Sequence, residues 1–328
     1  MITFTDFLDK HIVSAVVFAY HDIGVRCLEA LLELGVEIKL VVTHQDNPSE
    51  EIWFGSVAET AQRNGIAVIT PEDPNTPEVA GQLRQCKPDF IFSFYYRNML
   101  SPELLDIPRQ GAFNVHGSLL PKYRGRVPVN WAIIHGEREC GVSLHRMVVK
   151  PDAGKLLAQQ AVPILINDTA HEVFQKLKCA AESLILDQVP RMIAGTSIET
   201  PLDLAKGSYF SGRRPQDGKI DWTLPARQIH DLIRAVAPPY PGAFFQSGAR
   251  HIELLGSYYR GEKARSSDPG IYFENRNFQA DCCDGHRFMI THMKIDQVKA
   301  DLPLFERLFG QRLELTATML QDEPTSNG

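Results

Sequence analysis

The feature that most constrains the fold is the alternation of two hydrophobic patterns along the first third of the chain. Apolar runs of strand length alternate with segments whose apolar residues recur at helical spacing. The strand-like runs occupy residues 12–19, 36–44, 66–70, 88–94 and 111–116, and the helical patterns occupy residues 24–35, 54–65 and 78–86. Because the runs are nearly continuously apolar, both faces of each strand must be buried. We therefore predict an α/β fold with a Rossmann-like, mostly parallel sheet and helices on both faces.

The pattern changes from about residue 139. Two strand patterns flank the turn "KPDAG", a helical pattern follows at residues 169–195, and another lies at residues 226–236. Beyond it the chain consists of short β-like runs broken by glycines and charged turns. We predict an α/β domain at residues 1–210 and a small C-terminal β-barrel-like (OB-like) domain at residues 211–320. The composition of residues 321–328 predicts a disordered tail.

Composition excludes several classes of protein. The 328 residues carry a formal net charge of -6 and are 44% hydrophobic, which is typical of a globular enzyme and argues against a nucleic-acid surface. No run approaches the ~18 apolar residues of a membrane span, and the start "MITFTDFLDKHIVS" does not resemble a signal peptide, so we expect a cytoplasmic protein. The six cysteines show no CxxC pairing, which indicates reduced thiols and no metal site.

Three polar residues stand where ligands bind in such sheets. Asn114 and His116 end a strand two residues apart, so their side chains point to the same side, at the carboxyl end where ligands bind in open parallel sheets. An imidazole with a pKa near ~6.5 can accept a proton from an attacking amine. The amide of Asn114 can stabilise an oxyanion, and a carboxylate such as Asp152 can orient the imidazole and raise its pKa. This set suits acyl or formyl transfer.

Each of these residues taken alone also has a structural explanation, since an Asp before Ala-Gly is usually a turn residue. Other chemistries fit less well. The first strand–helix turn, "FAYHDIGVRC", has one glycine, whereas dinucleotide binding needs several. A Ser118–His116–Asp152 hydrolase would require a G-x-S-x-G turn, which "HGSLL" lacks. No His or Cys pair has metal-ligand spacing, so we expect no metal.

The stretch "NVHGSLLPKYRGRVPVNWAIIHGE", followed by "GVSLHRM" and "DAG", resembles the tetrahydrofolate-dependent formyltransferase family. The resemblance extends from about residue 14 to residue 245. It implies that Asn114 stabilises the transition state, His116 is the general base and Asp152 tunes and orients it. The formyl donor would be N10-formyltetrahydrofolate, a co-substrate. The residues that the resemblance assigns to the donor are Asn98, Met99, Leu100, Arg126, Val148, Val149, Lys150 and Pro151.

Several stretches, among them "VVFAYHDIG" and "RAVAPPYPGAF", are most similar to the polymyxin-resistance subgroup of the family. This resemblance implies a nucleotide-linked amino sugar as acceptor, most specifically UDP-4-amino-4-deoxy-L-arabinose, and a role in lipid A modification. Methionyl-tRNA is the rival acceptor. The stretch "THQDNPSEEIWFGSVAE" is acidic and has no Lys or Arg, which disfavours tRNA.

Other expectations remain open at this stage. Other dTDP-, GDP- or UDP-amino sugars stay possible acceptors, and so does a folate- or nucleotide-sugar-binding protein without activity. Arg213 and Arg214 could contact a phosphate, but a solvated turn is the favoured interpretation. We expect a stand-alone transferase whose substrates are small molecules. We expect no membrane contact, and the chain could form homo-oligomers.

Overall fold

The computed structural model describes residues 12–47 and 52–315 of the chain. By their internal contacts these residues form two compact units. The first comprises the chain up to residue 125 with residues 141–162 and 175–210, and the second comprises residues 126–140, 163–174 and the chain from 211 onward. The functional domains predicted at residues 1–210 and 211–320 stay a prediction, and the tail predicted at 321–328 lies outside the described residues.

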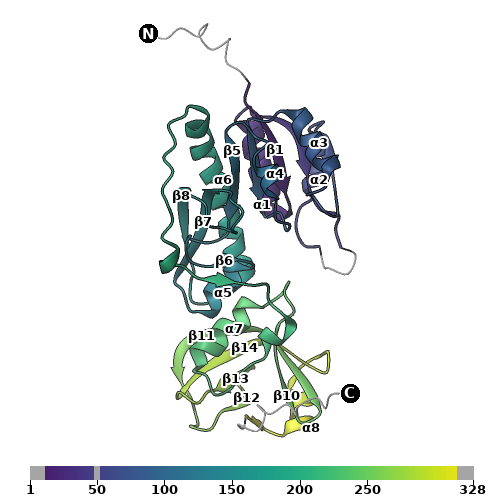
Figure 1. Ribbon diagram of the computed structural model, residues 1–328. Coiled ribbons are helices and arrows are strands. Elements are labelled where there is room, and N and C mark those ends of the chain that lie inside the picture. Colours follow the sequence, from purple (N-terminus) through teal and green to yellow (C-terminus); the bar gives the residue numbers. More distant parts are fainter. Residues whose placement is uncertain (1–11, 48–51, 316–328) are drawn as a thin grey trace, which may run out of the picture. The chain divides into compact units, whose positions relative to one another are not determined.

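The first unit is built on one twisted sheet, drawn from purple to teal in Figure 1. Its strands follow the order β3-β2-β1-β4-β5-β7-β8. Their bounds are β1 Ser14–Ala19, β2 Glu37–Val42, β3 Val68–Ile69, β4 Phe90–Phe94, β5 Gly111–His116, β7 Glu139–Arg146 and β8 Leu156–Pro163. The first five pair in parallel, and β7 runs antiparallel to β5. The predicted Rossmann-like, mostly parallel sheet is confirmed.

Helices lie on both faces of this sheet (Figure 1). Their bounds are α1 His21–Glu33, α2 Val57–Arg63, α3 Pro77–Cys86, α4 Pro102–Leu105 and α6 Ala170–Ile193. Helices α3 and α4 bury Leu83 and Leu104 in the same apolar cluster as Val16 and Leu40 of the sheet. Ser and Thr side chains at the N-caps of α2, α3 and α4 accept hydrogen bonds from backbone N–H groups of the first turn, which sets where these helices begin.

Helix α1 begins three residues before the predicted start at residue 24. Gly24 lies inside the helix and does not interrupt it. It allows close packing there, since a Cβ at Gly24 would lie 3.0 Å from Val57 Cγ2 and 3.1 Å from Ala19 Cβ. The end of α1 agrees with the sequence signal, since Gly35 follows the C-cap with a φ of +73°. A glycine within a helix can therefore mark close helix–strand contact as well as a boundary.

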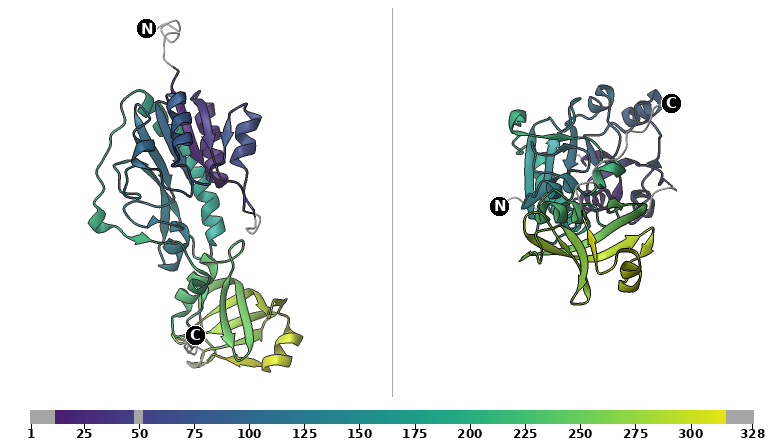
Figure 2. Two further views of the ribbon diagram at one scale, coloured as in Figure 1. Left: turned by 45° about the vertical axis from the view of Figure 1, so that its right-hand side comes forward. Right: turned by 90° about the horizontal axis from the view of Figure 1, so that it is seen from below.

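The second unit is built on an antiparallel sheet that curls like part of a barrel (Figure 2). Its strand order is β10-β11-β14-β13-β12-β16, with β15 paired to β14. The bounds are β10 Ala243–Ser247, β11 Arg250–Lys263, β12 Gly270–Glu274, β13 Asn277–Asp281, β14 His286–Ile295, β15 Val298–Lys299 and β16 Arg312–Glu314. The amphipathic helix α7, Ala226–Ala235, packs against β11. The predicted small β-barrel-like domain is confirmed as a fold class.

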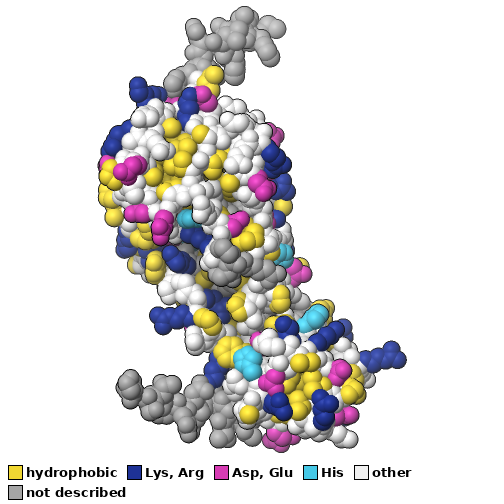
Figure 3. Space-filling view, turned by 90° about the vertical axis from the view of Figure 1, so that its right-hand side faces the viewer, with side chains coloured by type: hydrophobic (Ala, Val, Ile, Leu, Met, Phe, Trp, Pro, Cys, Tyr) yellow, Lys and Arg dark blue, Asp and Glu magenta, His cyan; other side chains and the backbone are white. Residues whose placement is uncertain are grey.

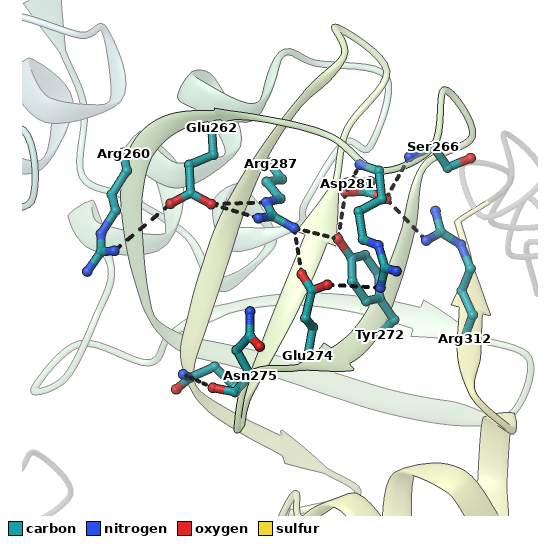
Figure 4. Close-up of polar contacts among 11 residues, drawn as sticks. Arg260, Glu262, Ser266, Tyr272, Glu274, Asn275, Asp281, Arg287 and Arg312 are labelled. Atoms are coloured by element: carbon teal, nitrogen blue, oxygen red, sulfur yellow. Dashed lines mark hydrogen bonds and ion pairs between the residues drawn. The ribbon is translucent and has the colours of Figure 1, made fainter.

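A network of ion pairs ties the strands of this sheet together (Figure 4). Arg287 on β14 donates to Glu262 on β11 at 2.8 Å, and to Glu274 on β12 at 2.7 Å. Arg312 on β16 pairs with Asp281 on β13 at 3.1 Å. Arg287 thus links β14 to the adjacent β11 and, across β13, to β12, and Arg312 links β16 across β12 to β13, so the network connects strands that are not all paired directly.

Two helices of this unit were not predicted from the sequence. Helix α5, Pro128–Ile134, follows the loop that contains Pro121, and helix α8, Leu302–Phe309, lies in a region expected to be β-like. Both begin with a proline within their first two positions, where the missing N–H costs nothing. In α8 the Asp301 side chain accepts the Leu304 N–H at 2.8 Å, and Phe305 is buried, so capping and burial outweigh the local strand pattern.

Candidate active site

The site is built on the antiparallel pairing of β5 with β7. In this register Asn114 lies opposite His145, and His116 lies opposite Ser143. Residues two apart on one strand and their cross-strand partners share one face, so the sheet brings the amide and both imidazoles together. His145 belongs to the motif "GVSLHRM" but was not assigned a role from the sequence. Only the strand register, which local sequence does not encode, could have revealed it.

Asp152 reaches this face from the turn between β7 and β8. Its backbone adopts the left-handed region, with a φ of 49°, and the Gly125 N–H donates to its Oδ2 at 2.9 Å. Two residues further on, a Cβ at Gly154 would lie 1.8 Å from the carbonyl oxygen of Arg146, so only glycine closes this turn. The sequence "DAG" thus produces a tight turn that holds one carboxylate in a fixed direction.

The side chains of the three predicted catalytic residues converge with that of His145. His116 Nδ1 and His145 Nε2 each lie 3.5 Å from Asp152 Oδ1. Asn114 Nδ2 lies 3.1 Å from His145 Nε2, and His145 Nδ1 lies 2.9 Å from the carbonyl oxygen of Arg146. A carbonyl requires a donor, so His145 carries its proton on Nδ1 and accepts the Asn114 amide proton on Nε2.

Burial and charge act in opposite directions on His116. The ring is 7% exposed, and its Nε2 lies 2.9 Å from the carbonyl oxygen of Tyr123, to which it donates. Desolvation lowers the pKa of His116 below its usual value, with Asp152 and the Tyr123 carbonyl opposing this change. Burial alone would raise the pKa of Asp152, but the positive charge that His116 and His145 carry when protonated, together with the Gly125 N–H, holds it far below its usual value. A neutral imidazole therefore faces an ionised carboxylate, with its lone pair on Nδ1.

The loop after β5 is fastened to the sheet by buried hydrogen bonds. The hydroxyl of Ser143 donates to the Ser118 carbonyl at 2.5 Å and accepts the Leu120 N–H at 3.0 Å. Gln159 on β8 donates to the Leu120 carbonyl at 2.9 Å. These contacts fix the loop that supplies the carbonyl of Tyr123 and the N–H of Gly125, so the backbone partners of His116 and Asp152 are preorganised.

The two stretches assigned to the donor, residues 98–100 and 148–151, adjoin the same apolar cluster of the first unit. Leu100 is buried in the apolar cluster of the sheet, against which Met147 also packs. Met99 is exposed, as are Val148 and Val149 of the second stretch. Asn98 is half-buried, and its side chain donates to the Glu72 carbonyl. Lys150 is exposed and Pro151 is half-buried. Arg126 is exposed and is the first residue of the second unit.

A separate pocket of about 280 Å³ opens beside the carboxyl ends of β1 and β2. Tyr20, His44 and Asp46 line it, and none of the converging residues does. His44 Nε2 accepts the Arg97 N–H at 3.0 Å, and burial with the nearby Arg97 charge lowers the pKa of His44 to about 4. This imidazole is therefore neutral at pH 7. The sequence analysis assigned no role to the pocket.

Among residues 12–47 and 52–315 no group of three or more His, Cys, Asp or Glu side chains is arranged to hold a metal ion. None of the helices described is long and apolar enough to cross a membrane.

Comparison with known proteins identifies the family. Residues 16–189 match the model of the formyl transferase family, and residues 213–301 match its C-terminal domain. The chain belongs to the formyl transferase family. The resemblance to tetrahydrofolate-dependent formyltransferases and the class of enzyme, both predicted from the sequence, are thereby confirmed.

Solved structures share the fold. An N-formyltransferase from Helicobacter canadensis, in complex with folinic acid and dTDP-3-aminofucose, is 24% identical with a TM-score of 0.68, over 85% of this chain and 99% of that one. WlaRD, a sugar 3N-formyl transferase with dTDP and 5-N-formyl-THF, is 21% identical with a TM-score of 0.67, over 85% and 97%. HypX from Aquifex aeolicus, in complex with tetrahydrofolic acid, is 17% identical with a TM-score of 0.62, over 92% and 48%.

Proposed function

We propose that this formyltransferase moves the formyl group of N10-formyltetrahydrofolate to the amine of a nucleotide-linked amino sugar. The observation that carries the proposal is the convergence of Asn114, His116 and Asp152, with Asp152 Oδ1 3.5 Å from His116 Nδ1. An amine that attacks a carbonyl needs a base for its proton and a donor for the developing oxyanion. The site contains one residue of each kind.

His116 Nδ1 is the proposed proton acceptor. Its Nε2 is committed to the Tyr123 carbonyl, so the free lone pair of the neutral ring lies on Nδ1, next to Asp152. When the attacking amine loses its proton to Nδ1, the imidazolium that forms is paired with a carboxylate that is already ionised. Asp152 thus stabilises the charge that His116 acquires only during the reaction.

Asn114 is the proposed oxyanion donor. Its amide has two N–H groups, and His145 accepts one of them at 3.1 Å. This contact fixes the orientation of the amide and leaves the second N–H for the formyl oxygen as negative charge develops there. A donor that is aligned before the reaction costs no reorganisation in the transition state.

The donor residues fit a flat, partly apolar ligand. Met99 and Val149 expose apolar side chains on two stretches that adjoin the same apolar cluster. The backbone groups of these stretches can recognise the edge of a pteridine. Arg126, which is exposed, is the proposed partner of the glutamate carboxylate. The donor supplies the formyl group, and these residues bind and orient it. Folate ligands in the solved relatives support the choice of donor.

The proposed acceptor is UDP-4-amino-4-deoxy-L-arabinose, and a dTDP- or GDP-linked amino sugar is the alternative. Solved relatives that contain dTDP or a dTDP-amino sugar support the wider class. On the face of the molecule in Figure 3, Lys and Arg side chains are interspersed with Asp and Glu. On this face, the mixed charge suits a small anion better than the long phosphate backbone of tRNA, which requires a continuous basic surface.

An acceptor panel tests the proposal. The purified chain is incubated with N10-formyltetrahydrofolate and, in turn, UDP-4-amino-4-deoxy-L-arabinose, dTDP- and GDP-amino sugars, and charged initiator tRNA. Formamide formation with a nucleotide sugar is expected, and H116A or D152A should abolish it while the fold is retained. The control is H292Q, which changes an exposed histidine of the second unit. Formylation of tRNA alone, or near-normal turnover by H116A, contradicts the proposal.

A further inference from the structure

Most of the buried or half-buried arginines in the described residues share one feature, and two, Arg213 and Arg124, lack it. Within the described part of the chain, buried or half-buried arginines form ion pairs with carboxylates: Arg146 with Glu199, Arg227 and Arg234 with Asp231, Arg287 with Glu262 and Glu274, and Arg312 with Asp281. The half-buried Arg213 has no such partner but lies over the ring of Trp131 at 5.8 Å. Arg124 has neither.

Arg124 is more buried than most of these arginines. Only 9% of the residue is exposed, and its Nε is buried without a hydrogen-bond partner among the described residues. The fully buried Arg234 differs in having an anionic partner: it pairs with Asp231 and donates to the carbonyls of Leu165 and Asp168, although its Nη2 is also buried without a hydrogen-bond partner among the described residues. Burying a guanidinium without such partners destabilises a fold. A buried cation that lacks an internal anion is explained when a ligand supplies the anion.

The position of Arg124 indicates which ligand this is. Arg124 begins the short strand β6, Arg124–Gly125, which pairs with β9, Tyr209–Phe210. The carbonyl of the preceding residue, Tyr123, accepts from His116, and the N–H of the following residue, Gly125, donates to Asp152. Arg124 is thus held between the two backbone groups that position the base and its carboxylate. An anion bound by Arg124 would therefore lie no further from the catalytic residues than the length of one arginine side chain allows.

Only one of the two proposed substrates has an anionic group close to its reacting atoms. In the acceptor, one sugar ring separates the diphosphate from the reacting amine. In the donor, an aromatic ring and an amide separate the glutamate carboxylates from the formyl group. We propose that Arg124 binds the diphosphate of the nucleotide-sugar acceptor and so sets the distance between that diphosphate and His116. This inference rests on the proposed function and adds a recognition residue that the catalytic set does not contain.

Binding of diphosphates to the full chain tests this role without turnover. Calorimetry measures the dissociation constants of UDP, dTDP and inorganic pyrophosphate for the wild type, R124Q, R124K and R126Q. We expect R124Q to weaken all three at least tenfold, because the bidentate contact is lost, and R124K to weaken them less. The affinity of R124Q for folinic acid should stay within twofold of wild type. R126Q should show the converse, with folinic acid weakened and UDP retained.

Thermal stability separates a ligand-binding arginine from a structural one. Without ligand, R124M should melt at or above the temperature of the wild type, because an uncompensated buried charge has been removed. UDP should raise the melting temperature of the wild type but not that of R124M. The matched control is R234M, which leaves Asp231 buried without its partner Arg234 and should melt lower.

The outcomes distinguish this inference from the proposed function. UDP affinity within twofold of wild type in R124Q overturns the assignment of Arg124, even if formyl transfer is observed. Arg124-dependent UDP binding without formyl transfer to any amino sugar supports the subsite and overturns the proposed function. Arg124-dependent binding of initiator tRNA, with no affinity for UDP, overturns the acceptor class. If R124Q and R124M do not fold, the UDP affinity of R124K decides, and an undiminished value overturns the proposal.

Discussion

At the scale of the residue, the site centres on the carboxylate of Asp152. Its Oδ1 faces two imidazoles, its Oδ2 accepts the Gly125 N–H, and its backbone is held in the left-handed region. Such a conformation costs about 1–3 kcal/mol and persists only where the surroundings enforce it. Here the enforcing contact is the tight turn at Gly154. The Gly125 N–H and the tight turn at Gly154 therefore keep the carboxylate beside the base at this cost.

The pH dependence of activity follows from the neutral state of His116. Burial lowers the pKa of His116 below 6.5, so the acid limb of kcat/KM against pH should fall below pH 6.5, with a plateau at neutral pH. Asp152 raises the pKa of His116, so D152N should move the limb to lower pH and depress the plateau. A pH profile of the two enzymes measures both effects. An acid limb that moves upward in D152N would contradict the assignment of the base.

His145 should behave as a positioning residue. N114A removes the oxyanion donor and should lower kcat about 100- to 1000-fold. H145A leaves the donor in place but unaligned, so we expect a smaller loss, about tenfold, with the KM for the folate donor unchanged. H145Q, which retains a hydrogen-bond acceptor for Asn114, should recover part of the rate. Steady-state kinetics separates kcat from KM, and equal losses in H145A and H145Q would exclude this role.

At the scale of the element, the pairing of β6 with β9 supports the site. Gly125 has a φ of +97°, and a Cβ there would lie 2.1 Å from the Phe210 carbonyl. G125A should therefore displace β6, release Asp152 and lower both stability and kcat. The control is G81A in helix α3, where nothing lies within 4 Å and alanine should stabilise by about 0.5–1 kcal/mol. Urea unfolding with activity assays checks both, and an active, stable G125A would contradict the prediction.

The sequence predicts the strands of the first unit because both faces are buried and the runs are continuously apolar. It also predicts Asn114 and His116, since they are neighbours on one strand. It does not predict His145, which enters the site only through the cross-strand register with Asn114. Helices α5 and α8 were missed because they are short, with 7 and 8 residues, and because the burial of Phe305 in α8 depends on residues distant in the sequence, such as Phe278. Local patterns thus determine elements, whereas tertiary pairing completes the site.

At the scale of the whole molecule, both units contain histidines that burial keeps neutral at pH 7; His44 is partly buried and His230 is fully buried. In the first unit the pKa of His44 is lowered to about 4. In the second unit the pKa of His230 is lowered to about 3, chiefly by burial, while Ser257 and the Ile166 carbonyl contact its two ring nitrogens. The unfolded chain protonates these rings near pH ~6.5, but the folded chain does so only at lower pH. Acid therefore destabilises both units.

The sign and the pH range of this effect can be tested on His230. Between pH 6.5 and about 3 the unfolded state holds one more proton at this residue, so the free energy of unfolding should fall by ~1.4 kcal/mol per pH unit as pH decreases. Above pH 6.5 the residue adds no pH dependence. The buried Trp222 reports on the second unit, so its fluorescence in urea titrations from pH 7.5 to 5 measures the slope.

Replacing the histidine isolates its contribution to that slope. H230Q keeps a polar group beside Ser257, but glutamine cannot be protonated. The slope of its unfolding free energy against pH should therefore be smaller by ~1.4 kcal/mol per pH unit. At pH 7.5 we expect H230Q to be less stable than the wild type. H292Q, a change at an exposed histidine of the same unit, should leave the slope as in the wild type. If H230Q and the wild type lose stability in parallel below pH 6.5, His230 is not the neutral buried group, and the acid lability of the second unit originates elsewhere.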